Sequence, residues 1–395
     1  MKTALLACAL LASGFALRRY EARHPISRPA LHPVVVPKPS PSASPSAADN
    51  THIQVALLLD TSNSMDGLID QAKSRLWNII NTLTTLRDKG KAPVIEIALY
   101  EYGNDGLPRE QDYIRQVTPL TTDLDLISEK LFALRTNGGS EYCGAVIRSA
   151  LNSLHWGADE ADMKLIYIAG NESFNQGEIS YKRSTADAVN KNIFVSTIYC
   201  GDKRSGIGEL WKDGADRGRG EYFNIDSDRK VAFITTPYDA QIEACNDRIN
   251  KTYIAYGVHG ASKKSNQVIQ DSNAKSLSSA NSTERYVSKS KAIYKNESWD
   301  LVDRVEQDKS VLKTMTKTDL PQELQNKTPE EMYAIIKAKG EERVTIQKEI
   351  ATLAKQREKY IAEASKNVSH TDDLGAAING SIIRMANAKG YQVEK

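Results

Sequence analysis

Short apolar runs alternate with helical patterns along the first half of the chain. The longest pattern, residues 67–88, repeats apolar residues at spacings of three and four, which is typical of a helix with one buried face. Further helices are expected at 123–134, 142–154, 180–191, 205–214 and 237–253. The apolar runs are short enough to be buried strands, and they lie at 53–59, 93–103, 113–120, 163–170, 192–200 and 221–225. Strands and helices in alternation predict an α/β fold with a doubly wound, mostly parallel, six-stranded sheet.

The chain changes character after residue 257. Residues 258–320 are polar, and the stretch 261–290 has few large apolar side chains, so we expect a flexible or loosely helical connector with a short helix. Residues 321–395 are expected to form a charged helical tail that ends in an amphipathic helix near 374–389. The α/β domain itself is placed at 51–257.

The tail contains a partial heptad pattern, formed by Ile346, Ile350, Leu353, Tyr360 and Ala364 and interrupted by Arg357. Two interpretations stay open: a short coiled coil, or a helix or helical hairpin packed back on the domain.

The N-terminus has the features of an export signal. Lys2 precedes an apolar run that ends at residue 17, which is short for a membrane-spanning helix. Residues 18–50 follow as a linker rich in proline and serine. We expect 1–17 to be a signal peptide, with an uncleaved membrane anchor as the alternative, and the protein to be secreted to the periplasm or cell envelope.

Composition excludes two classes of protein. The chain has 52 basic and 50 acidic residues, a net charge of +2, so no basic surface for nucleic acid is indicated. Its six histidines form no zinc-binding cluster. Apart from Cys8 in the signal segment, the cysteines are Cys143, Cys200 and Cys245, and an odd number in an exported protein suggests one disulfide and one free thiol.

The stretch LLDTSNS (58–64) is the strongest candidate for a site. Asp60 ends the first predicted strand, where ligands of parallel α/β sheets bind, and Ser62 and Ser64 follow at spacings of two and four. One carboxylate with hydroxyl groups suits a hard divalent cation such as Mg²⁺, Mn²⁺ or Ca²⁺. Alternatively, Asp60 caps the following helix and the serines bind loop amides.

This motif, in its strand–helix context, resembles the metal-ion-dependent adhesion site (MIDAS) of von Willebrand factor type A (VWA) domains. The loop TNGGSEYCG (136–144) is similar to the family's glycine-rich loop, with Ser140 in the place of a threonine. In YIAGNESF (167–174), Asn171 stands where the family has an aspartate, which removes one negative charge. We expect Glu141 and Glu172, each beside a matched position, to restore that charge as auxiliary metal ligands, although neither belongs to the family pattern.

The resemblance implies a non-enzymatic module that binds an acidic side chain of a partner protein through a divalent cation, Mg²⁺ foremost. The helical tail would then be a spacer, a self-association element or a second docking surface. Cys143 and Cys200 are expected near the same end of the sheet, where a disulfide would stabilise the site's rim; two buried free thiols are the alternative.

Two other functions stay open. The first is a structural envelope protein with a vestigial metal site. The second is a metal-dependent phosphohydrolase of the haloacid-dehalogenase type, which also begins with an aspartate at the end of a strand. That class needs a second carboxylate two residues later, where this chain has Ser62. The chain also contains no phosphate-binding loop and no nucleophile elbow.

Overall fold

The computed structural model describes residues 50–365 and 374–394. The signal segment (1–17) and nearly all of the linker (18–50) expected from the sequence lie outside these residues.

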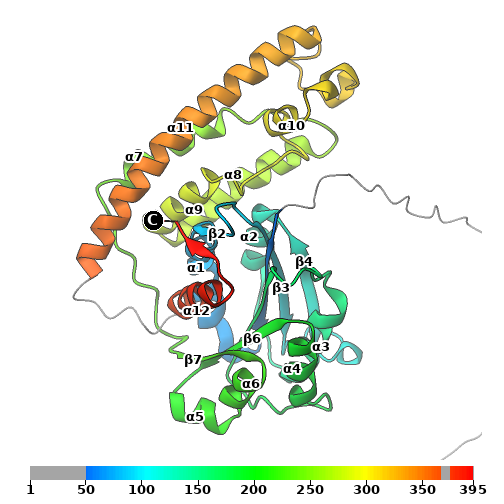
Figure 1. The fold of residues 1–395 in the computed structure, drawn as a ribbon, viewed down its shortest axis with the longest axis vertical. Helices are drawn as coiled ribbons and strands as arrows, with labels where there is room; N and C mark the ends of the chain where they lie inside the picture. Colours follow the sequence, from blue (N-terminus) through cyan, green and yellow to red (C-terminus); the bar gives the residue numbers. More distant parts are fainter. Residues whose placement is uncertain (1–49, 366–373, 395) are drawn as a thin grey trace, which may run out of the picture. The chain divides into compact units, whose positions relative to one another are not determined.

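A six-stranded sheet forms the centre of the described part of the chain, in the order β4-β3-β1-β5-β6-β7 (Figure 1). Five strands are parallel and β4, at one edge, is antiparallel. The strands are β1 (His52–Asp60), β3 (Val94–Tyr102), β4 (Ile114–Thr121), β5 (Met163–Gly170), β6 (Ile193–Cys200) and β7 (Arg219–Ile225). The predicted doubly wound α/β fold is therefore confirmed, with all six strands in the expected places.

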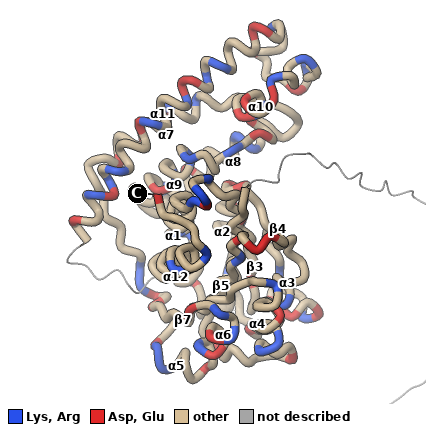
Figure 2. Tube along the Cα trace, in the orientation of Figure 1, with Lys and Arg blue, Asp and Glu red and all other residues tan. Residues whose placement is uncertain are grey.

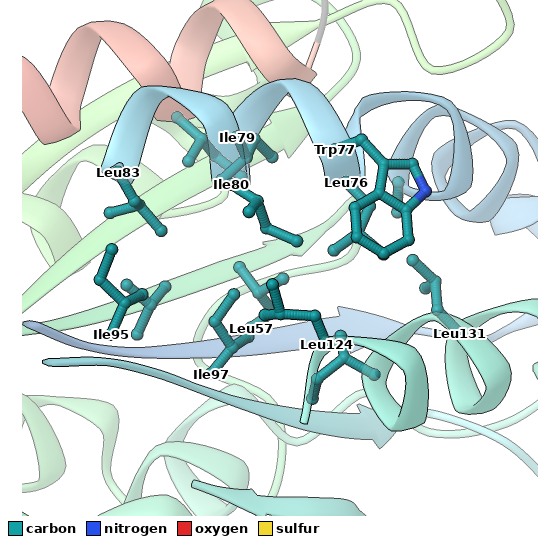
Figure 3. Packing of buried hydrophobic residues seen from close by; sticks show 14 of the residues in the cluster. Leu57, Leu76, Trp77, Ile79, Ile80, Leu83, Ile95, Ile97, Leu124 and Leu131 are labelled. Carbon is teal, nitrogen blue, oxygen red and sulfur yellow. The ribbon is translucent and has the colours of Figure 1, made fainter. Parts of the chain in front are cut away.

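Helices cover both faces of the sheet, and successive residues of β1 point to opposite faces. Leu57 and Leu59 pack under α1 (Asp66–Leu83) and α2 (Leu124–Ala133), as Figure 3 shows for Leu57, Leu76, Leu83 and Leu124. Ala56 and Leu58 face the other layer. That layer consists of α3 (Cys143–Ser153), α4 (Tyr181–Asn190) and α6 (Trp211–Arg217). Because both faces are covered, β1 is buried along almost its whole length, which explains its continuous apolar run.

Two helices differ from their predicted bounds. α1 ends at Leu83 instead of residue 88, where the hydroxyl groups of Thr84 and Thr85 bind the last carbonyls of the helix. The chain then forms β2 (Leu86–Arg87), which pairs with β8 (Gln392–Val393). The helix expected at 205–214 is instead two helices, α5 (Lys203–Gly208) and α6, separated by Leu210 in a left-handed conformation.

The predicted flexible connector is wrong. After α7 (Asp239–Asn250), residues 258–320 form three α-helices, α8 (Gly260–Leu277), α9 (Ser279–Lys289) and α10 (Leu301–Gln307), followed by two short 3₁₀ helices. α9 packs on α1 and α7, and α8 packs on α2. Low apolar content misled the prediction, because α9 buries polar side chains instead, including Arg285 and Lys289, both fully buried and hydrogen-bonded.

The charged tail forms a 36-residue helix, α11 (Pro329–Ala364), with charges of both signs interspersed along it (Figure 2). α11 packs on α7, α9 and α10. It therefore lies against the domain, as expected from the interpretation of the tail as a helix packed back on the domain. Arg357 does not interrupt its buried stripe. It extends the stripe formed by Ile346 and Ile350, because its guanidinium binds Asp239 at 2.9 Å and Glu284 at 2.6 Å.

The last helix, α12 (Leu374–Ala388), packs on α1, β5 and β7. Its first residue, Leu374, donates its backbone N–H to Gln71 of α1 at 3.0 Å, and its Ser381 lies 3.5 Å from Ser196 of β6. The C-terminal residues of the chain therefore complete one helical layer of the α/β domain.

The expected disulfide between Cys143 and Cys200 is also wrong, since Cys143, Cys200 and Cys245 are free and buried. Cys143 belongs to the core under α3 and α4, whereas Cys200 points to the core on the other face of the sheet. The sheet itself separates the two sulfur atoms, although both residues lie toward the same end of it.

Within residues 50–365 and 374–394, no helix has the length and apolar character that crossing a bilayer requires.

Candidate metal centre

The site forms where β1, β3 and β5 end side by side. Asp60 is the last residue of β1, and it pairs in register with Tyr102 of β3. Gly170 ends β5 on the other side, so closely that a Cβ on it would lie 2.9 Å from Asp60 Oδ2. Carboxyl ends of parallel strands meet at one edge of a sheet, which is why residues distant in sequence converge here.

The DTSNS loop turns its polar groups back toward Asp60. The backbone N–H of Ser62 donates to Asp60 Oδ1 at 2.8 Å, and Ser62 Oγ lies 3.3 Å from Ser64 Oγ. A short 3₁₀ turn, Asn63–Met65, then leads into α1, whose N-terminal cap is Met65. Asp60 does not cap α1, so the alternative in which it acts as a helix cap is wrong.

The glycine-rich loop is fixed against the same strand ends. Asn137 donates its backbone N–H to the carbonyl of Thr61 at 2.9 Å. Gly139 approaches so closely that a Cβ on it would lie 2.2 Å from the carbonyl oxygen of Gly103. Ser140 follows on this loop and is half-buried, and its hydroxyl has no hydrogen bond within the part of the chain that the structure describes.

The loop after β5 brings Asn171 to the two serines. Asn171 Nδ2 lies 3.1 Å from Ser64 Oγ, and the carbonyl of the neighbouring Glu172 accepts a 2.7 Å hydrogen bond from the indole of Trp211. The structure thus joins Asp60, Ser62, Ser64 and Asn171 in one hydrogen-bonded chain.

Asp60 is fully buried, and only one of its two carboxylate oxygens has a hydrogen-bond partner. Its Oδ1 accepts the Ser62 N–H, but its Oδ2 has no hydrogen-bond partner. Burial, together with the negative charges of Glu141 and Glu172, raises the pKa of Asp60 to about 7, although the Ser62 hydrogen bond acts to lower it. An unpartnered buried carboxylate oxygen is costly, and a bound cation would remove that cost.

The residues present fit a divalent cation. The donors are one buried carboxylate, serine hydroxyls and an amide oxygen, which is a hard-oxygen set. Among the described residues, no three His, Cys, Asp or Glu side chains form a metal-binding cluster, so hydroxyl oxygens would have to supply much of the coordination.

Comparisons with known proteins give structural likenesses alone. No family model matches the sequence, and no curated protein matches it. A solved structure of the conserved hypothetical protein BatB from Bacteroides thetaiotaomicron is similar to this chain at 17% identity and a TM-score of 0.34, covering 44% of this chain and 90% of that one. The SpRpn10 VWA domain is 15% identical, with a TM-score of 0.33 and coverage of 44% and 87%.

A third solved structure is proximal thread matrix protein 1 from the mussel byssus, described as having a zinc-occupied MIDAS motif. It is 12% identical, with a TM-score of 0.34 and coverage of 44% of this chain and 42% of that one.

The assignment of the fold comes from this chain's own topology. A doubly wound sheet with one antiparallel edge strand carries the DTSNS loop at the end of its central strand, and the glycine-rich loop lies against that loop. This topology is the fold expected from the resemblance to VWA domains. Asp60, Ser62, Ser64 and Asn171, expected from the sequence to form the site, lie together at this edge of the sheet.

Sequence reasoning missed one residue of this candidate site. Gly103 follows β3 with φ of +76°, and a Cβ on it would lie 2.9 Å from Asp60 Oδ1 and 2.9 Å from Glu141 Cγ. Glycine is needed both for the left-handed conformation and for the space between these side chains. A glycine directly after the second strand was the available signal, but only the fold places it beside Asp60.

Proposed function

We propose that this chain is a non-enzymatic, metal-dependent binding module. Asp60, Ser62, Ser64 and Ser140 would hold a divalent cation, Mg²⁺ foremost, and Asn171 would act in an outer role. The observation that carries the proposal is the unpartnered Oδ2 atom of a fully buried Asp60 at the end of the central strand. A cation gives this oxygen a partner that no described side chain supplies.

The bound cation would contribute an open coordination position to which an acidic side chain of a partner protein binds. The N-terminal sequence supports export, so the partner would be met in the periplasm or cell envelope. The long helix α11 would serve as a surface for self-association or for docking of a second partner.

One observation favours the structural alternative with a vestigial site. The amide of Asn171 already binds Ser64, so this hydroxyl has a partner without a metal. The two functions differ in whether the isolated protein binds a cation.

Isothermal titration of Mg²⁺ or Mn²⁺ into the metal-stripped protein separates them. We expect wild type to bind one cation and Asp60→Ala to lose that binding, because Asp60 supplies the buried anionic oxygen. A pull-down from envelope extract should then recover a partner with Mg²⁺ and lose it with EDTA. A wild-type protein that binds neither cation would rule out the metal-dependent function.

A second variant tests the departure from the family pattern. Asn171→Asp adds a carboxylate at the matched position, and an added charge close to a cation is worth more than the hydrogen bond to Ser64 that it replaces. We expect cation affinity to rise about tenfold or more, equivalent to about 1.4 kcal/mol. Ser173→Asp, which adds the same charge two residues later on the same loop, is the control. An unchanged affinity in Asn171→Asp would show that position 171 lies outside the coordination shell.

A further inference from the structure

Resting on the proposed metal-binding function, we propose that Glu141 is a direct ligand of the cation. It would supply the second negative charge that Asn171 does not provide.

The positions of Asp60 and Glu141 are the first argument. Glu141 precedes α3 and is 7% exposed. Asp60 Oδ1 and Glu141 Cγ each lie 2.9 Å from one point, the place that a Cβ on Gly103 would occupy. A glycine at position 103 therefore leaves room for the side chain of Glu141 beside the carboxylate of Asp60.

The charges around this space are the second argument. The charges that act on Asp60 come from Glu141 and Glu172, and Glu172 also acts on Glu141. Two buried carboxyl groups side by side are unfavourable unless a cation or a proton lies between them. With the unpartnered Oδ2 of Asp60, this arrangement points to a cation.

Glu172 does not share these properties. It is exposed on the loop after β5, where its backbone carbonyl binds Trp211. Its charge reaches Asp60 through solvent and is screened by salt, so it can raise the local cation concentration without ligating.

This assignment affects how a partner binds. Asp60 and Glu141 together match the double charge of the cation, so an acidic side chain of a partner has to compete with Glu141 for it. The module would then bind such a partner more tightly when Glu141 leaves the cation.

The test compares Glu141→Gln with Glu172→Gln in the full-length protein, by calorimetric titration of Mg²⁺ and by Mn²⁺ electron paramagnetic resonance. We expect Glu141→Gln to lower cation affinity by about 100-fold, since a buried ligand charge is lost. Glu172→Gln should lower it by less than about tenfold, and about 0.3 M KCl should remove most of that loss. Circular dichroism checks that both variants fold.

A double variant separates a ligand from a merely structural residue. Glu141→Gln combined with Asn171→Asp moves the second carboxylate to the family's position, and we expect affinity to return to within about tenfold of wild type. A structural role for Glu141 would show no such rescue.

The results distinguish two failures. If wild type binds the cation and Glu141→Gln binds it equally well, or loses no more than Glu172→Gln, the assignment of Glu141 is overturned and the binding function stands. If wild type binds no cation, the proposed function fails, and this assignment fails with it.

Discussion

Asp60→Asn is expected to stabilise the metal-free protein at pH 8 by up to about 4 kcal/mol and to leave its stability almost unchanged at pH 4. Burial raises the folded-state pKa of Asp60 from 3.8 to about 7, and each pKa unit corresponds to about 1.4 kcal/mol. The folded protein therefore binds more protons than the unfolded chain between these pH values. Wild-type stability must fall as the pH rises from about 4 to about 7, whereas asparagine stays neutral and still offers an oxygen to the Ser62 N–H.

Urea unfolding in EDTA at several pH values measures this difference. Saturating Mg²⁺ should reverse the order at pH 8, because ligand binding stabilises only the protein that retains the carboxylate. Asp187→Asn, an exposed substitution on α4, is the control and should change stability by less than about 0.5 kcal/mol. A pH-independent loss of stability in Asp60→Asn would show that Asp60 is a structural acceptor instead of a strained metal ligand.

Asp271→Ala should destabilise the fold by about 3–5 kcal/mol, because it leaves the buried Lys289 without an ion-pair partner and removes one of the two carboxylates that bind the buried Arg285. Asp271 lies on α8, where Arg285 binds it at 2.6 Å and Lys289 at 2.8 Å. Burial alone would raise the pKa of Asp271, but Lys289 and Arg285 outweigh burial and hold that pKa well below its usual range. Its stabilising effect is therefore fully present above pH 4 and is lost only as the pH falls further.

Urea unfolding at pH 7 measures the loss. Glu243→Ala is the matched control, because it removes the partner of Lys275 in an exposed pair between α7 and α8 and should cost less than about 1 kcal/mol. Asp271→Asn retains hydrogen bonding without the charge and should lie between wild type and Asp271→Ala. An Asp271→Ala protein within 1 kcal/mol of wild type would show that this network does not hold α8 and α9 in place.

The central sheet and the core of the site could be predicted from local pattern. The run that ends at Asp60 is apolar because helices cover both faces of the sheet, and the 3.6-residue period of α1 follows from its one buried face. Ser62 and Ser64 need only a turn after the strand to approach Asp60. The secondary structure of these elements can be predicted from a short segment, because the spacing of its apolar side chains indicates which face is buried.

The rest depended on contacts between distant parts of the chain. Arg285 is buried on a polar helix because Asp125, 160 residues away, binds it, so no local pattern could show that α9 is part of the core. Cys143 and Cys200 lie on opposite faces because α3 covers one face of the sheet, whereas side-chain alternation along β6 directs Cys200 to the core on the other face.

The same distinction applies to the candidate site. The sequence by itself determined the strands, the helix after the site and the serines that follow Asp60, because hydrophobic periodicity and motif spacing are local. From the sequence alone, Glu141 and Glu172 were equivalent candidates for auxiliary metal ligands. Only the tertiary structure separated them, by placing Gly103 between Asp60 and Glu141 and leaving Glu172 in solvent. Whether a charged side chain can be buried depends on the groups around it, and these groups come from distant segments. A single stretch of sequence therefore cannot show which charged residues are buried.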